Sequence, residues 1–155
     1  MVSSPRNFPM ATPRAAAGAL FLDHEGRILM VRPTYKEGWD IPGGYIEPGE
    51  TPMDACAREI TEEIGLHRAP GRLLVVDWAP HPDEGDKILF VFDGGTLTGT
   101  GSLTPDGEEI AEAQFCHSDT LPEITPERLT RRLKLAIEAR ERNITLYAQH
   151  GTPTP

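Results

Sequence analysis

A helix predicted over residues 52–64 constrains the fold more than any other segment, because its start, its end and its two faces can be read from the sequence. Thr51 is a good N-cap, Pro52 suits the first helical position, and Gly65 provides a natural stop. One apolar stripe follows the spacing of a helical turn and comprises Met53, Ala57, Ile60 and Ile64. We expect this stripe to pack against a sheet.

The other side of the predicted helix carries three glutamates, Glu59, Glu62 and Glu63, related as i, i+3 and i+4. Their carboxylates are expected to converge, at a cost of a few tenths of a kcal/mol per pair on a solvated helix. One interpretation is a solvated polar face on which Arg58 pairs with Glu62. The other is a site for a hard divalent cation such as Mg²⁺, which takes oxygen ligands and is usually shared with substrate phosphates.

Residues upstream of the helix favour the second interpretation. Gly43 and Gly44 leave the backbone bare, so its carbonyls and amides can approach a metal or a phosphate near the acidic face. Glu50 can pair with Arg58 and so orient the neighbouring Glu59. Such outer-shell pairing is typical of the groups that surround metal ligands.

The rest of the chain predicts one α/β (α+β) domain over residues 14–147, with a flexible arm over 1–13 and a flexible tail over 148–155. Apolar, β-branched and aromatic runs predict the strands 16–22, 28–32, 73–78, 88–92 and 113–116. A second helix is expected to run to about residue 142, with Thr125 as its N-cap. Its basic residues are expected to face solvent: Arg128, Arg131, Arg132 and Lys134.

The charge balance argues against a general binder of DNA or RNA. Fifteen basic residues against 24 acidic residues give a formal net charge of -9, whereas binding to nucleic acid needs a basic surface. A small phosphorylated substrate stays open because metal ions can supply positive charge. The two cysteines, Cys56 and Cys116, form no disulfide framework, and no apolar run reaches the roughly 18 residues of a membrane span. We therefore expect a cytoplasmic protein with no membrane partner.

The spacing of residues 44–66 resembles the sequence box of the Nudix hydrolase family, G-x5-E-x7-R-E-U-x-E-E-x-G-U, where U is a bulky aliphatic residue. All nine defined positions match, over 23 of the 155 residues: Gly44, Glu50, Arg58, Glu59, Ile60, Glu62, Glu63, Gly65 and Leu66. This is far more specific than a lone glycine motif. The resemblance implies the family's α/β/α sandwich around a mixed β-sheet, with which the predicted order of elements is compatible.

The resemblance also implies hydrolysis of a phosphoanhydride bond in a nucleoside diphosphate linked to another group, X, with Mg²⁺ or Mn²⁺ as cofactor. The metal ligands would be Glu59, Glu62, Glu63 and the carbonyl of Gly43, with Glu59 the most central. Glu62 or Glu63 would also help to activate water. The remaining pair, Arg58 and Glu50, would orient the ligands.

Residues outside this box are weaker candidates. Many family members add a carboxylate from a late loop as general base or metal ligand, for which Glu109 is favoured over Glu108 and Glu112. Substrate contact is expected from Gly44 and from Arg32, Tyr35 and Trp39, although an edge-strand arginine, a solvated tyrosine and a packing tryptophan are the alternatives.

The group X stays open, since loops set specificity. A nucleotide sugar such as ADP-ribose and a nucleoside triphosphate are both candidates, and Pro82, sixteen residues after Leu66, resembles the ADP-ribose pyrophosphatase branch. A non-catalytic nucleotide-sensing domain is the alternative function, although such domains typically lose box carboxylates. Isopentenyl diphosphate isomerisation would need a catalytic cysteine, and Cys56 is expected to be a packing residue. A homodimer is possible by analogy with the family.

Overall fold

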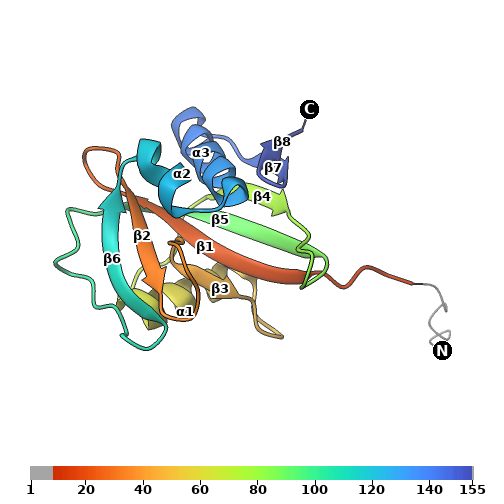
Figure 1. The fold of residues 1–155 in the computed structure, drawn as a ribbon, viewed down its shortest axis with the longest axis horizontal. Helices are drawn as coiled ribbons and strands as arrows, with labels where there is room; N and C mark the ends of the chain where they lie inside the picture. Colours follow the sequence, from red (N-terminus) through yellow and green to blue (C-terminus); the bar gives the residue numbers. More distant parts are fainter. Residues whose placement is uncertain (1–8, 155) are drawn as a thin grey trace.

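The computed structural model describes residues 9–154 and contains an eight-stranded mixed sheet between two helical layers (Figure 1). The strands follow the order β6-β2-β1-β5-β4-β7-β8, and β3 pairs with β1 outside this path. The α/β/α sandwich expected from the sequence is confirmed. The strands are β1 (Arg14–Leu22), β2 (Ile28–Pro33), β3 (Gly43–Tyr45), β4 (Leu73–Trp78), β5 (Lys87–Thr96), β6 (Ile110–Cys116), β7 (Leu146–Gln149) and β8 (Thr152–Pro153).

Strand β1 is the centre of the sheet and the element that positions the site. It runs parallel to β5 along its whole length and antiparallel to two other strands at its two ends. Near its end, Leu22 pairs with Ile28 of β2, whereas its first half, residues 16–18, pairs with β3. Because β2 and β3 pair with opposite ends of β1, the loop that joins them runs beside the sheet.

One helical layer covers each face of the sheet. Helix α1 (Pro52–Ile64) packs on the face that carries Phe21 and Leu29. The short helices η1 (Ser118–Thr120) and α2 (Leu121–Ile124) lead into α3 (Glu127–Arg142), which packs on the face that carries Leu20 and Leu22. Since side chains of a strand alternate between faces, β1 alone supplies apolar residues to both cores.

Helix α1 begins and ends at the predicted residues. The Thr51 side chain accepts a hydrogen bond from the Asp54 N–H at 3.1 Å, and Gly65 ends the helix with a left-handed φ of 69°. The predicted apolar stripe is wrong in its first half, because Met53 is 44% exposed and Cys56 is fully buried. The buried face is rotated toward Glu63, a residue that a hydrophobicity pattern assigns to the outside.

The end of the chain is part of the sheet. Strand β7 runs parallel to β4, and β8 folds back antiparallel on β7. The flexible tail predicted over residues 148–155 is therefore wrong for residues 148–153, whereas Pro155 and residues 1–8 of the predicted arm lie outside the described residues. The prediction failed because the contacts that order this polar segment come from distant residues: the buried Asp77 accepts a hydrogen bond from Gly151 N–H at 3.0 Å.

Other differences are shifts of boundaries and short elements that were not predicted, among them β3 and α2. Strand β5 extends to Thr96, and α3 has Pro126 as its N-cap in place of Thr125. The Thr125 hydroxyl instead donates to the carbonyl of Leu121 at 2.7 Å, because Thr125 ends α2, a helix that the sequence analysis did not predict. Within residues 9–154, every helix is too short or too polar to span a lipid bilayer.

Candidate active site

Three carboxylates from two distant parts of the chain meet beside β3. Glu59 and Glu63 lie on α1, and Glu109 lies in the loop before β6; each offers an oxygen within 4.8 Å of the other two. Glu63 is only 3% exposed, whereas Glu109 is open to solvent. A set of carboxylate oxygens at this spacing suits a hard divalent cation, which would also remove the repulsion between them.

Glu63 is the most buried member of this acidic cluster. Its Oε1 accepts a hydrogen bond of 2.7 Å from the backbone N–H of Gly43. Burial raises the pKa of Glu63 to about 8, with further increases from the charges of Glu59, Asp40 and Glu109, while the Gly43 N–H acts in the opposite direction. A neighbouring cation would favour the charged form of Glu63.

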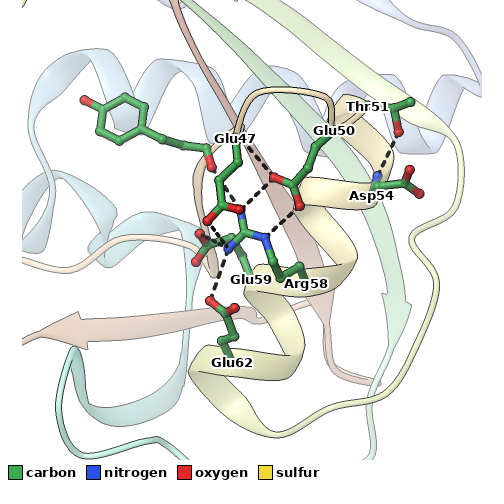
Figure 2. Close-up of polar contacts among 8 residues, drawn as sticks. Glu47, Glu50, Thr51, Asp54, Arg58, Glu59 and Glu62 are labelled. Atoms are coloured by element: carbon green, nitrogen blue, oxygen red, sulfur yellow. Dashed lines mark hydrogen bonds and ion pairs between the residues drawn. The ribbon is translucent and has the colours of Figure 1, made fainter.

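Arg58 holds the second member of the cluster in place (Figure 2). Its Nε and Nη2 donate to the two carboxylate oxygens of Glu50 at 2.7 and 2.9 Å, and its Nη1 donates to Glu59 at 2.9 Å. These bonds from the guanidinium lower the pKa of Glu50 to about 2. The structure thus places Glu50, Arg58 and Glu59 in one chain of charge-assisted hydrogen bonds, which fixes the orientation of the Glu59 carboxylate.

Glu62 lies outside the cluster of Glu59, Glu63 and Glu109, although it shares the donor Arg58 Nη1 with Glu59. Its side chain is 56% exposed and accepts a bond of 3.1 Å from Arg58 Nη1. Of the three carboxylates of α1, only Glu59 and Glu63 therefore meet in the cluster, and Glu62 is linked to it through Arg58. The structure combines the two interpretations of the helix, since Glu62 makes the solvated ion pair while Glu59 and Glu63 join Glu109.

The two glycines of β3 approach the cluster closely. A Cβ on Gly44 would lie 2.5 Å from the Glu59 carboxylate, and a Cβ on Gly43 would lie 2.5 Å from the backbone oxygen of Ala17. A side chain added at Gly44 would thus meet a movable carboxylate, whereas one added at Gly43 would meet the backbone of β1. The contact of Gly43 with the cluster is through its N–H; its carbonyl remains a predicted ligand.

Two residues that hold Glu109 were missed by the sequence analysis. Asp106 Oδ1 accepts hydrogen bonds from three successive N–H groups, those of Glu108, Glu109 and Ile110, at 2.9–3.1 Å. The Thr34 N–H donates to the Glu109 carbonyl at 2.8 Å. The dipeptide Asp106-Gly107 is a turn signal that could have located the first of these contacts.

A cleft of about 630 Å³ adjoins the acidic cluster, because Gly43 and Gly44 line it and also contact Glu63 and Glu59. Its floor is formed by β1 and β5, and its walls come from β3, the loop before it, the β4–β5 loop and the start of α3. Three of the four residues expected to contact substrate line it: Gly44, Tyr35 and Trp39. Arg32 does not, since it pairs with Glu112 across β2 and β6 at 2.7 Å.

Two arginines of α3 also line the cleft, contrary to the expected solvated face. Arg128 donates to the carbonyl of Pro80 at 3.0 Å. Arg132 is only 11% exposed and donates through Nε to the buried Asp77 at 2.6 Å. No helical pattern reveals such a role, because Asp77 lies on a strand 55 residues earlier.

The cysteine of α1 supports no chemistry at this site. Cys56 is fully buried, and burial raises the pKa of its thiol to about 12. A thiol of this kind stays protonated at neutral pH and is a poor nucleophile. Its packing role agrees with the expectation from the sequence. Cys56 is therefore unsuited to serve as the catalytic cysteine that isopentenyl diphosphate isomerisation would need.

Comparisons with known proteins agree with this geometry. Residues 12–136 match the model of the NUDIX domain. YjhB of Bacillus subtilis (strain 168), provisionally named an ADP-ribose pyrophosphatase, is 36% identical over 123 residues, which are 77% of this chain and 57% of YjhB. A protein of the same strain, provisionally named an 8-oxo-dGTP diphosphatase, is 32% identical over 106 residues, 68% of each chain. A crystal structure of a UDP-X diphosphatase superposes with a TM-score of 0.74 at 27% identity, covering 93% of this chain and 70% of that one.

Proposed function

Because the chain belongs to the Nudix family, we propose that it is a divalent-metal-dependent pyrophosphohydrolase. The reaction is attack of water on phosphorus, which breaks a phosphoanhydride bond in a nucleoside diphosphate linked to X. The observation that carries this proposal is the meeting of Glu59, Glu63 and Glu109 beside β3, whose two glycines also line the cleft. The complete box of acidic residues favours catalysis over a nucleotide sensor, the second candidate.

The acidic cluster suits Mg²⁺ or Mn²⁺. Glu59 and Glu63 would hold the ion, and Glu62 and the Gly43 carbonyl are proposed as further ligands. When bound, such an ion neutralises phosphate oxygens and lowers the pKa of water in its coordination shell. Arg58 and Glu50 keep the Glu59 carboxylate in one orientation through the bonds in Figure 2.

We propose Glu109 as the general base. It is the solvent-exposed member of the cluster, so a water molecule can reach its carboxylate. Asp106 and Thr34 fix its backbone, which limits the positions that its side chain can take. A base placed in this way removes a proton from the attacking water as the bond to phosphorus forms.

The cleft is proposed to hold the nucleotide and the group X. Its volume of about 630 Å³ lies within the range of small-molecule sites. Tyr35 and Trp39 offer aromatic surfaces for a base or a sugar, and the bare backbone at Gly44 allows the diphosphate to approach the cluster. A nucleotide sugar such as ADP-ribose is the first candidate substrate, since YjhB is named for that activity.

The test is identification of products by mass spectrometry over a panel of ADP-ribose, other nucleotide sugars, dinucleoside polyphosphates and nucleoside triphosphates, including oxidised ones. Wild type is compared with Glu59→Gln, in Mg²⁺, in Mn²⁺ and in EDTA. Glu138→Gln is the matched control, because Glu138 is a solvent-exposed carboxylate on α3 that pairs with Arg142. We expect metal-dependent cleavage that only Glu59→Gln abolishes. A nucleotide that binds and is never cleaved would instead support the sensor.

A further inference from the structure

We propose that Arg128 and Arg132 of α3 form a second anion-binding site in the cleft, which recognises a phosphate monoester of the substrate outside the cleaved anhydride. The inference rests on the proposed function, because one cleft would hold both the cleaved bond and this group. The two arginines come from a different element than the acidic cluster: in Figure 1, α3 lies above β1 in the view and β3 lies below it.

The charge of Arg128 is not compensated by a carboxylate. Its side chain makes one hydrogen bond among the described residues, to a neutral group, the carbonyl of Pro80, and takes part in no ion pair within residues 9–154. The lysines of the cleft differ in this respect, since Lys36 pairs with Asp40 and Lys87 pairs with Glu84. Arg128 is therefore a cation that a ligand can neutralise.

Arg132 uses only the Nε of its guanidinium for bonding within the described residues, so its two terminal nitrogens are left for a ligand. Its Nε donates to Asp77 Oδ2 at 2.6 Å, and neither of its terminal nitrogens forms a hydrogen bond within residues 9–154. No fully buried side-chain nitrogen in that range lacks a partner, so these nitrogens are not fully buried, and Arg132 lines the cleft. The open edge of a guanidinium matches the oxygen pair of a phosphate.

The two arginines lie on the same face of α3, because residues four apart in a helix are neighbours. Asp77 compensates one of the two positive charges, so the pair retains a net charge of about +1. Glu37 also lines the cleft, on the loop that carries Tyr35 and Lys36, and in the described part of the chain it forms no ion pair with either arginine. An uncompensated arginine strengthens the binding of a phosphate monoester more than that of a neutral hydroxyl. The effect matters most in a chain of net charge -9, which otherwise repels anions.

The experiment compares substrates that differ by one phosphate monoester: dephospho-coenzyme A with coenzyme A, and ADP-ribose with its 2′-phosphate. Two quantities are measured, kcat/KM with Mg²⁺ and the Kd by calorimetry in EDTA. We expect wild type to prefer the phosphorylated partner of at least one pair by about tenfold, the gain from one charge-assisted contact. Arg128→Gln, which keeps an N–H donor for the Pro80 carbonyl, is expected to abolish that preference.

Two further variants make the result specific. Arg128→Lys keeps the charge and is expected to retain part of the preference, and Arg142→Gln, at the solvent-exposed far end of α3, is expected to retain all of it. The inference would be overturned if wild type bound the two members of each pair with equal Kd values, or if the preference persisted in Arg128→Gln. Absence of hydrolysis for every compound here and in the wider substrate panel would contradict the proposed function, while the Kd values would still decide on Arg128.

Discussion

At the scale of single residues, the site depends on where side chains are absent as much as on where they are present. Gly43 and Gly44 are adjacent on β3, and an added methyl group would meet backbone at the first and the Glu59 carboxylate at the second. The sequence analysis predicted both as site residues from the bare backbone that they provide. It could not predict that their neighbours differ, because these come from β1 and α1.

Substitution by alanine should therefore affect activity at one of the two glycines and stability at the other. Gly44→Ala is expected to displace the Glu59 carboxylate and lower kcat/KM by about 100-fold, with little change in stability. Gly43→Ala is expected to lower the free energy of unfolding by about 1–3 kcal/mol, since the Ala17 backbone cannot move aside. Thermal melts and steady-state kinetics on both variants test this contrast. Equal loss of stability in the two would contradict it.

Glu109 gives a second prediction at this scale. If it is the general base, Glu109→Gln lowers kcat by about 10²–10⁴-fold and leaves the affinity for Mn²⁺, followed by electron paramagnetic resonance, close to that of wild type. Glu108→Gln is the control, because Glu108 precedes it in the same exposed loop and lies outside the acidic cluster. A parallel loss of Mn²⁺ affinity in Glu109→Gln would identify it as a ligand.

At the scale of elements, local sequence determined α1 and long-range contacts determined the chain's end. The limits of α1 follow from Thr51, Pro52 and Gly65, which act within one turn of the helix, so they were predictable. Strands β7 and β8 are ordered by pairing with β4 and by Asp77, contacts that a local pattern does not contain. The same limit explains Arg132, whose partner is that distant aspartate.

Asp77 should be the principal polar contact that attaches the β7–β8 hairpin. It is fully buried and receives bonds from Arg132 and from the Gly151 N–H. Asp77→Ala leaves Arg132 without its carboxylate in a largely buried position, and we expect a loss of about 3–5 kcal/mol in the free energy of unfolding. Hydrogen exchange should show faster exchange at residues 146–153 than elsewhere. The conservative Asp77→Asn should lose less, and a similar loss in both would argue against the charge pair.

At the scale of the whole molecule, the acidic cluster couples global stability to pH and to metal. Burial raises the pKa of Glu63 from its usual 4.5 to about 8, so the folded protein binds a proton that the unfolded chain releases. In EDTA, the free energy of unfolding should therefore fall as the pH rises from about 4.5 to about 8, by a few kcal/mol at most. Burial raises the pKa of Glu59 as well, which acts in the same direction.

Denaturant titrations of the metal-free protein between pH 5 and 8.5 measure this dependence. Glu63→Gln is expected to remove most of the decline, and Mg²⁺ is expected to raise the stability of wild type most at the high end of the range. Glu138→Gln, with its solvent-exposed carboxylate on α3, should keep the decline of wild type. A decline that is the same in Glu63→Gln would mean that other groups cause it.

The residues proposed for catalysis and those that line the cleft are distributed differently along the chain. The acidic residues proposed for chemistry lie mostly within one continuous segment, residues 44–66, whereas the lining of the cleft is collected from stretches scattered between Ala16 and Arg132. A chimera that exchanges only residues 44–66 with the equivalent segment of a relative should therefore retain the substrate choice of its recipient. Changing that choice would require coordinated substitutions in several loops and in α3, so new specificities are expected to arise by gradual change at scattered positions, with the continuous segment left intact.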